Sequence, residues 1–376
     1  MMCILVLIIY TNQTLGERIN PVQNTMIATE PSNPLAAVNK LMAQAGQAAN
    51  KAAARHVFDN ALSGKAANTD RRKKADLALF ETFLNECGVP ARELYSNPQA
   101  WQGVTWGIVE SFKAWMLKQG YAMASVNGRL STVRSHAALA AAAGVIGDSE
   151  SRMIASVKGY TQKEARHVDE KRRADGLNTR KGSKKAQAVN IPEDISEAMI
   201  AQPNTPQGRR DAFLMCLLLE HGLRVSEIAI LTRDNFDLKS NQFIFYRPKV
   251  NITQTHELTP NTRKAAAAYI KYDCPADGIL WRKSHKGTNK LGGQLSATSA
   301  TRALTKRVEL LGRKAGISGL SAHDARHYWA TYEARKNTPI NRLMQAGGWN
   351  SPAMPLRYIA AAEIANAGTA RVKDNE

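Results

Sequence analysis

Two short motifs in the second half of the chain place arginines beside side chains that could hold or assist them. In the motif HGLRVSE, Glu227 follows Arg224 by three positions, a spacing that lets the carboxylate hold the guanidinium in place. In SAHDARH, His323 and Arg326 are also three positions apart, so both side chains can point to one ligand. Guanidinium and imidazole groups bind anionic oxygens, and imidazole also transfers protons.

Two further signals follow toward the C-terminus. The motif GGWNS places Trp349 directly after two glycines, and Tyr358 follows nine residues later in PLRYI. Taken singly, each of the four signals has a plain structural interpretation. The arginine could lie at a surface, the helical histidine and arginine could be solvated, the tryptophan could anchor a turn, and the tyrosine could fill a helix core.

In this order the motifs resemble the active site of the tyrosine recombinases, also called the phage-integrase family. That family presents Arg, Lys, His-x-x-Arg, His or Trp, and then Tyr. The matching residues here are Arg224, His323, Arg326, Trp349 and Tyr358. The spacing from the tryptophan to the tyrosine also agrees with the family, and the resemblance extends from about residue 70 to the C-terminus. It implies a site-specific DNA recombinase or integrase of a phage or another mobile element.

The family also uses a lysine on a β-hairpin that follows the first arginine. Residues 242–249 are expected to form a strand there. Lys249, before the turn, is the candidate, and Lys239 upstream is its competitor. The chain departs from many family members at Trp349, where they carry His. Because an indole N–H can donate a hydrogen bond but cannot act as an acid or base, more of the proton transfer would fall to His323 and Lys249.

The reaction implied by the resemblance is attack of the Tyr358 hydroxyl on a DNA phosphodiester. Arg224 and Arg326 would clamp the non-bridging oxygens, and such preorganised donors are typically worth about 3 to 4 kcal/mol each at the transition state. A tyrosine with a pKa near 10 needs a proton acceptor, for which His323 is the candidate, and Lys249 is the candidate general acid for the leaving 5′ oxygen. The 3′-phosphotyrosine product can be attacked by a second 5′ hydroxyl, so neither ATP, a metal nor another cofactor is expected.

The sequence leaves three alternatives open. Glu227 is expected to hold Arg224 rather than react, but it could be an ordinary solvated helix carboxylate. The chain could also be a type IB topoisomerase, which shares this chemistry but does not exchange strands between partners. Finally, it could be a DNA-binding regulator with an inactive site, although the presence of all five matching residues argues against this.

The elements that must position these residues are predicted to be mostly helical. Apolar residues at helical spacing, such as Leu77, Phe80 and Leu84, predict a small helical domain over residues 69–150. It resembles the family's core-binding domain, which is SAM-like. The catalytic domain is expected over residues 191–376 as mostly helix with a small antiparallel β-sheet, so the fold class is mainly α.

Basic residues outside the catalytic motifs are candidates for contact with DNA phosphates. Arg129 and Arg134 lie on the last long helix predicted in the small domain, where they could also form a solvated face. Residues 151–190 are expected to be a basic linker, since residues 152–185 contain eleven Lys or Arg against four acids. Such a segment can track a DNA backbone or remain a solvated tether. Its candidate DNA contacts are Lys171, Arg172 and Arg173.

The charge of the whole chain indicates a polyanionic partner. Lys and Arg number 51 against 32 Asp and Glu, which gives a net charge of +19 and a pI near 9.9. Each cation set against a phosphate releases counterions, so this excess favours nucleic acid binding. Charge alone leaves DNA and RNA equally open, and the resemblance selects double-stranded DNA. It also implies a homotetramer on two DNA sites, linked by segments after Tyr358, and leaves room for an accessory directionality protein.

The N-terminus and the cysteines bear on where the protein is located. Residues 1–68 are expected to be an accessory, poorly ordered segment, of which residues 34–61 could be helical. The apolar stretch 3–10 is too short for a membrane span of roughly 20 residues and lacks the basic flank of a signal peptide. Translation is expected to start at Met26, and the alternative is that the stretch is a short apolar tail that packs on the protein. Four scattered cysteines favour a reduced, cytoplasmic protein without membrane contact.

Overall fold

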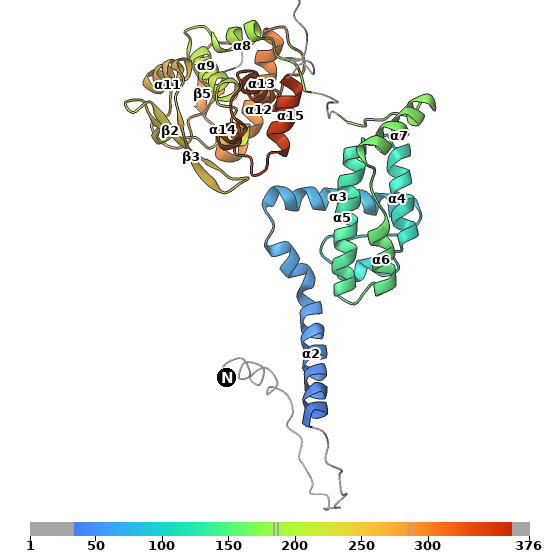
Figure 1. Cartoon of the computed structure of the whole chain (residues 1–376). Coiled ribbons are helices and arrows are strands. Elements are labelled where there is room, and N and C mark those ends of the chain that lie inside the picture. The colour runs from blue at the N-terminus through green and yellow to red at the C-terminus, as the bar shows by residue number, and fades with distance from the viewer. Residues whose placement is uncertain (1–33, 183–184, 186–187, 286, 363–376) are drawn as a thin grey trace, which may run out of the picture. The chain divides into compact units, whose positions relative to one another are not determined.

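The chain folds into two compact units, Met1–Lys184 and Lys185–Glu376. The structure is a computed structural model that describes residues 34–182, 185, 188–285 and 287–362. Both units are mainly helical, and the second also holds two small antiparallel sheets (Figure 1). The predicted fold class, mainly α with a small antiparallel sheet in the catalytic part, is confirmed.

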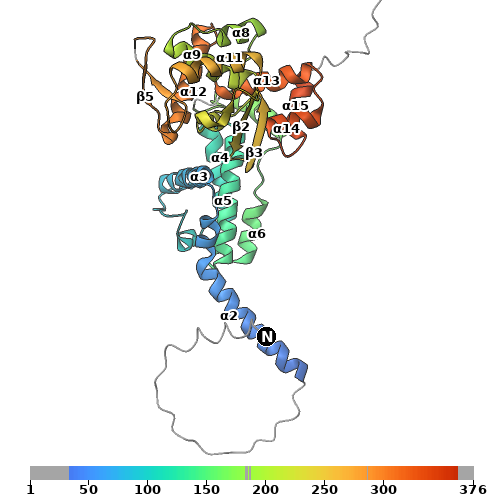
Figure 2. The same cartoon turned by 90° about the vertical axis from the view of Figure 1, so that its left-hand side faces the viewer.

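The first unit is a helical bundle built on apolar faces. Its helices are α2 (Pro34–Ser63), α3 (Ala67–Glu86), α4 (Trp106–Lys118), α5 (Met123–Ala142), α6 (Asp148–Ser156) and α7 (Gln162–Ala174), with a short 3-10 turn η1 (Pro98–Trp101). Leu77, Phe80 and Leu84 of α3 are buried, as their spacing predicts, and belong to one core with residues of α4 and α5. Figures 1 and 2 show α2 projecting from this bundle, to which it is joined by the buried Phe58.

The range expected to be a basic linker, residues 151–190, is largely helical up to residue 174. It contains most of α6 and all of α7, whose first turn is closed by a capping box. Arg172 of α7 is buried. Its Nη2 donates to the backbone carbonyls of Leu117, Tyr121 and Asn178. Because a buried guanidinium is stabilised by such bonds, Arg172 ties α7 to the bundle, and the segment differs from the solvated tether that its composition suggests.

The second unit combines helices with two small sheets. Its helices are α8 (Glu193–Ile200), α9 (Pro206–Leu219), α10 (Val225–Ile228), α11 (Pro260–Tyr272), α12 (Ala297–Lys314), α13 (Ala322–Arg335), α14 (Ile340–Gly347) and α15 (Ala353–Ala362), with a 3-10 turn η2 (Arg233–Asn235). One antiparallel sheet has the order β1 (Phe236–Asp237), β2 (Gln242–Arg247) and β3 (Ile252–Glu257). The other pairs β4 (Arg282–Ser284) with β5 (Leu291–Gln294).

Helix α9 is the buried helix of the second unit. Its residues 213–219 are all buried, as their unbroken apolar run predicts. Residues of β2 alternate between exposed and buried, so Phe243, Phe245 and Arg247 face inward. Helix α13 packs against α9, α12, α14 and α15, and Figures 1 and 2 both show α13, α14 and α15 side by side. The segments that carry His323, Arg326, Trp349 and Tyr358 therefore lie on α13 or on the helices packed against it, or directly follow one of them.

Two predictions about the chain ends fall partly outside what the structure describes. The helix expected over residues 34–61 is present as α2. The apolar stretch 3–10 and Met26, and the last residues 363–376, lie outside the described residues. Within the described ranges, no helix is both long and apolar enough to cross a bilayer.

Candidate active site

Arg224 and Glu227 form an ion pair at the start of α10. Arg224 Nη1 lies 2.6 Å from Glu227 Oε1, and Glu227 Oε2 accepts the backbone N–H of Arg224 at 2.9 Å. Gly222 brings the chain into this position with a φ of 59°, and a side chain there would collide with the ring of Trp329. The side chain of Glu227 is 1% exposed, so it is not a solvated carboxylate, whereas that of Arg224 is 21% exposed. The carboxylate thus fixes a guanidinium that still reaches the surface.

Arg326 lies on α13 and bonds to the backbone of two other segments. It is buried, and its Nη1 donates to the carbonyl of Gly222 at 2.6 Å. Its Nη2 donates to the carbonyl of Gly347. Arg326 therefore connects the segment that leads to Arg224 with the segment that leads to Trp349.

His323 lies on the first turn of α13, one turn before Arg326. Ser321 and Asp324 close this turn by a capping box, and Asp324 also binds Lys185 at 2.6 Å, so the start of α13 is held in place. Partial burial and the charge of Arg326 lower the pKa of His323 below its usual value of 6.5. Its imidazole is therefore neutral at pH 7 and able to accept a proton.

Trp349 follows α14 after a glycine in the left-handed conformation. Gly348 ends that helix with a φ of 61° and a ψ of 52°. The ring of Trp349 stacks on Trp329 of α13 with centroids 6.0 Å apart. The guanidinium carbon of Arg326 lies 4.6 Å from the Trp349 ring centroid, so the indole and the guanidinium are held as a pair.

Tyr358 lies on α15 and is only 3% exposed. Its ring packs edge-on against His327 with centroids 4.9 Å apart, and it lies 5.6 Å from the ring of Trp349. Burial raises the pKa of Tyr358, and the positive charges of Arg326 and Arg224 oppose that rise. The phenol thus lies within electrostatic range of both arginines, but it is packed within the unit rather than presented to solvent.

Lys249 and Lys239 lie in turns at opposite ends of β2. Lys249 is exposed in the turn between β2 and β3, two residues after Arg247. Lys239 is exposed in the turn between β1 and β2. A strand of this length spans about 20 Å, so the two amines lie at well separated places. Since Arg247 bonds to Glu227, the Lys249 end of β2 is the end nearest the arginines.

The structure adds a third guanidinium that the sequence reasoning does not single out. Arg247, the last residue of β2, is fully buried. Its Nη1 donates to Glu227 Oε2 at 3.0 Å, and its Nη2 donates to the carbonyl of Ala346 at 2.6 Å. The signal available in the sequence is that the alternation of Phe243 and Phe245 continues to Arg247, which puts a charged residue at an inward-facing position.

Positive charge is concentrated at this site. Burial and repulsion from Arg224 lower the pKa of Arg326 to about 10, whereas Glu227 opposes this change. Burial also lowers the pKa of Arg247. Both remain protonated at neutral pH. The guanidiniums of Arg224, Arg247 and Arg326, called the arginine cluster below, therefore lie near the carboxylate of Glu227. This excess of positive charge fits an anionic phosphodiester. No cluster of three or more His, Cys, Asp or Glu that could hold a metal ion occurs in the described part of the chain.

Arg129 and Arg134, two arginines predicted to contact DNA, are half-buried and contact groups within the first unit. The guanidinium carbon of Arg129 lies 4.1 Å from the ring centroid of Tyr121, and its Nε lies 3.8 Å from Asp76 Oδ1. Arg134 Nη1 donates to the carbonyl of Val157 at 3.1 Å, just beyond the end of α6. Both side chains therefore connect α5 to neighbouring elements.

The basic run on α7 is divided in the same way. Arg172 is buried against backbone carbonyls, whereas Lys171 and Arg173 on either side of it are exposed. Only the latter two present their charge to solvent, and they remain candidates for a DNA contact. Whether a basic helical residue faces inward depends on tertiary partners that its own sequence neighbourhood does not contain.

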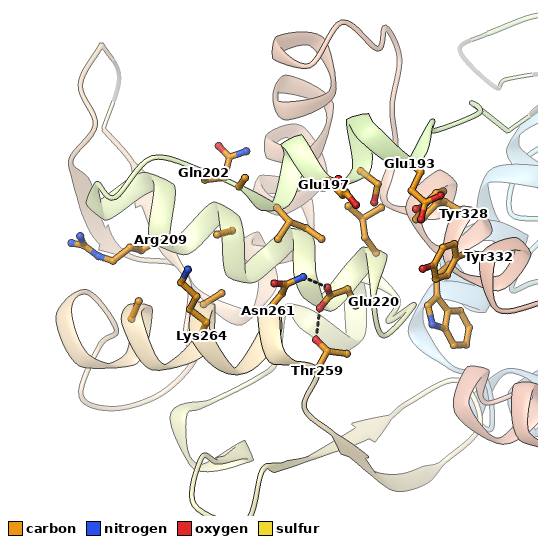
Figure 3. A pocket seen from close by; sticks show the side chains of 18 of the residues that line it. Glu193, Glu197, Gln202, Arg209, Glu220, Thr259, Asn261, Lys264, Tyr328 and Tyr332 are labelled. Atoms are coloured by element: carbon orange, nitrogen blue, oxygen red, sulfur yellow. Dashed lines mark hydrogen bonds between the residues drawn. The ribbon is translucent and has the colours of Figure 1, made fainter. Parts of the chain in front are cut away.

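A pocket of about 940 Å³ opens elsewhere on the second unit (Figure 3). It is lined by residues of α8, α9, α11 and α13, among them Tyr328 and Tyr332. In its wall, Glu220 accepts hydrogen bonds from Thr259 and, at 2.8 Å, from Asn261. Its described lining includes none of the six residues predicted to be catalytic. The pocket is therefore distinct from the arginine cluster.

Comparison with known proteins supplies a family for the second unit. Residues 190–364 match the model described as the phage integrase family. The tyrosine recombinase XerC of Syntrophus aciditrophicus (strain SB) is 22% identical over 306 residues, which cover 78% of this chain and 87% of that protein. The integrase of Salmonella phage P22 is 40% identical over 62 residues, but these cover only 16% of this chain and 14% of that protein.

Two solved structures share the fold over most of the chain. The Tn1549 transposon integrase in complex with a circular intermediate DNA has a TM-score of 0.57 at 14% identity, covering 84% of this chain and 98% of that chain. A lambda integrase dimer bound to a core site has a TM-score of 0.54 at 15% identity, covering 81% of this chain and 93% of that chain. At these identities the likeness concerns the fold and not the individual residues.

Proposed function

Because the chain belongs to the phage integrase family of tyrosine recombinases, enzymes that cut and rejoin DNA at specific sites, we propose that Tyr358 cleaves DNA by forming a 3′-phosphotyrosine. The chain acts in DNA recombination and integration and breaks and rejoins DNA strands. The observation that supports the choice of Tyr358 is its position beside Trp349, within electrostatic range of Arg224 and Arg326.

The arginines bind the phosphate in this proposal. Part of the Arg224 side chain is exposed, and Glu227 fixes its guanidinium. The guanidinium is therefore already oriented to bind the scissile phosphate. Arg326 supplies buried positive charge behind it, and Trp349 lies against Arg326. These donors act on the charge that develops on the non-bridging oxygens, which makes electrostatic stabilisation their main contribution.

Two proton transfers accompany the cleavage. The bond from Tyr358 Oη to phosphorus forms as the bond to the 5′ oxygen breaks, so the phenol loses a proton and the leaving oxygen gains one. His323, neutral at pH 7 because its pKa is lowered, is the candidate acceptor. Lys249 is the candidate donor, supported by its place at the end of β2 nearest the arginines. A 5′ hydroxyl from a second strand then attacks the phosphotyrosine and reverses both transfers.

A buried phenol cannot attack a phosphate outside the protein, so α15 must shift when DNA binds. Helix α15 has ten residues and packs mainly on α13 and α14. A short helix with few contacting elements opens at a lower cost than a core helix. The resting contact of Tyr358 with His327 would then be exchanged for contact with the phosphate.

Double-stranded DNA is the partner, and the integrases of similar fold that were solved with DNA support this. We infer that a homotetramer assembles on two DNA sites and that the chain after Tyr358 links its subunits. Residues up to 362 belong to α15, whereas 363–376 lie outside the described residues. An accessory directionality protein and a cytoplasmic location fit this function. Lys171 and Arg173, both exposed, are the proposed phosphate contacts of the first unit.

The direct test is covalent trapping on a nicked target site, where the short 5′ fragment diffuses away and prevents religation. The wild-type chain should leave an SDS-stable adduct, and Tyr358→Phe should bind the same DNA but leave none. Tyr332→Phe, a change in a tyrosine on α13 outside the arginine cluster, should leave the adduct intact. A wild-type chain that binds the site without an adduct would favour the regulator, and relaxation of supercoiled DNA that lacks the site would favour a type IB topoisomerase.

A further inference from the structure

Arg247 occupies a position where a sheet normally places an apolar side chain. It is the third inward-facing residue of β2, after Phe243 and Phe245, and it is fully buried. Its guanidinium carbon lies 4.7 Å from the ring centroid of Phe245. Removing a guanidinium from water is costly unless its N–H groups are paired, so a buried arginine at this position requires hydrogen-bond acceptors around it.

All three nitrogens of the Arg247 guanidinium donate hydrogen bonds. Nε donates to Gln254 Oε1, and Nη1 donates to Glu227 Oε2 at 3.0 Å and to the carbonyl of Gly347 at 3.3 Å. Nη2 donates to the carbonyl of Ala346 at 2.6 Å. Arg247 therefore connects the β2–β3 hairpin with α10 on one side and with the carboxyl end of α14 on the other.

Glu227 is shared between two arginines. Its Oε1 accepts from the Arg224 side chain, and its Oε2 accepts from the Arg224 backbone and from Arg247. Each carboxylate oxygen therefore has fixed partners on a different side. Without Arg247, Oε2 would keep the Arg224 backbone N–H but lose the one charged partner that it has among the described residues, so the carboxylate that holds Arg224 would be less firmly fixed.

The carbonyl of Gly347 is shared in the same way. It accepts hydrogen bonds from both Arg247 and Arg326. The next residue, Gly348, has a φ of 61°, and a Cβ there would lie 2.7 Å from Cδ of Arg247. Gly348 thus leaves the space that Arg247 fills, whereas a Cβ at Gly347 would lie 2.0 Å from the ring of Trp349.

We propose that Arg247 is a positioning residue for the strand-transfer reaction, fixing Glu227 and the Gly347 turn and, through them, Arg224 and Trp349. The proposal rests on the function assigned to the arginine cluster. Arg247 has no exposed surface and so does not touch the phosphate itself. Its fork matches this task, because one lysine ammonium cannot reach the carboxylate and both carbonyls in fixed directions.

The test measures single-turnover cleavage of a trapping substrate at saturating full-length protein, together with DNA affinity and the thermal midpoint. Arg247→Met should lower the cleavage rate by about 100-fold, since small displacements of catalytic groups have effects of that size. Arg247→Lys keeps the charge but loses the fork, and it should recover part of the rate. The Kd for DNA should stay within about threefold for both variants, because the contacts to DNA are made by other residues.

Arg210→Met is the matched control. Arg210 is also buried, lies 2.7 Å from Asp211 Oδ1, and donates to the carbonyl of Arg282 at 2.9 Å, but it lies outside the arginine cluster. It should lower the thermal midpoint and leave the cleavage rate per folded molecule unchanged. A second test combines Arg247→Met with Glu227→Gln. In the Glu227→Gln background, Arg247→Met should lower the cleavage rate by a smaller factor than in the wild-type background.

Cleavage by folded Arg247→Lys and Arg247→Met at the wild-type rate, or with the same loss as Arg210→Met, would overturn the proposal. If Arg247→Met does not fold, the proposal is tested by the cleavage rate of Arg247→Lys, alone and combined with Glu227→Gln. A wild-type chain that forms no adduct at Tyr358 would instead refute the proposed function, so the two failures are distinguishable.

Discussion

Tyr358 packs edge-on against His327, with ring centroids 4.9 Å apart and ring planes at 81°. The contact joins α15 to α13 and holds the proposed nucleophile inside the unit. Because burial raises the pKa of Tyr358, its hydroxyl remains protonated in this state at neutral pH. In the proposed mechanism, a phenol held in this way would not react with DNA until α15 moves, so DNA binding would precede cleavage.

Binding of the target DNA is therefore expected to loosen α15. Amide hydrogen exchange of peptides from residues 353–362 should be faster in the complex than in the free chain, measured with Tyr358→Phe so that no covalent product forms. Peptides from α9, residues 206–219, should exchange equally in both states because that helix is buried in the core. Unchanged or slower exchange of α15, in a complex that the wild-type chain cleaves, would contradict the expected movement.

Lys249 is expected to protonate the leaving 5′ oxygen. Lys249→Ala should slow cleavage of ordinary DNA by about 10² to 10⁴-fold, the usual contribution of a general acid. Replacing the bridging 5′ oxygen by sulfur should abolish most of this loss, because a thiolate leaves without protonation.

The matched control for this test is Lys239→Ala, at the other end of β2, which should cleave both substrates at the wild-type rate. A Lys249→Ala chain that remains equally slow on the sulfur substrate would assign the lysine another role.

Gly222 is expected to be intolerant of any side chain. Its φ is 59°, and a Cβ would lie 2.1 Å from the Trp329 ring, so Gly222→Ala should lower the free energy of unfolding by about 3 kcal/mol or more. Gly319→Ala provides the comparison, because Gly319 has a φ of 69° but its nearest neighbour would lie at 3.7 Å. It should cost about 1 to 2 kcal/mol from backbone conformation alone. Equal losses in the two variants, measured by urea unfolding, would show that the Trp329 contact does not matter.

The candidate catalytic residues other than Lys249 could be singled out from the sequence, because each belongs to a short motif and their order resembles that of the family. The helices were predictable where apolar spacing was regular, as for Leu77, Phe80 and Leu84. The role of Arg247 could not be predicted. Strand alternation shows that this residue faces inward, but it does not show that Glu227 and two backbone carbonyls accept its hydrogen bonds. These partners come from segments 20 and about 100 residues away.

The DNA contacts and the state of the nucleophile were harder for the same reason. A basic residue on a helix, such as Arg134 or Arg172, has the same sequence signature whether it faces phosphates or caps carbonyls of its own unit. The burial of Tyr358 depends on how α15 packs on α13, and the local sequence around PLRYI does not encode it. The local sequence pattern therefore predicts helices, strands and candidate motifs. The side-chain contacts between distant segments are known only from the structure.

His221 should make the stability of the second unit depend on pH. It is buried beside Thr262, and burial lowers its pKa to about 4, whereas the unfolded chain has the usual value of 6.5. Below pH 6.5 the unfolded state binds the proton first, so stability is lost as pH falls from 6.5 toward 4. Between pH 7 and pH 5 this histidine should cost about 2 kcal/mol.

The measurement is urea unfolding at pH 7 and at pH 5, in which the hydrogen exchange of α9 reports the unfolding of the second unit. His221→Gln should be less stable than wild type at pH 7, but it should lose about 2 kcal/mol less on going to pH 5. A variant with the same pH dependence as the wild-type chain would show that His221 titrates normally.

In the proposed reaction, the phenol of Tyr358 becomes joined to the 3′ end of the cleaved strand. Its most direct test is to digest the trapped adduct with protease and nuclease and to locate the nucleotide-bearing peptide by mass spectrometry. We expect a single modified peptide, with the phosphoryl nucleotide on Tyr358. A nucleotide on any other residue, such as Tyr328 or Tyr332 of α13, would contradict it.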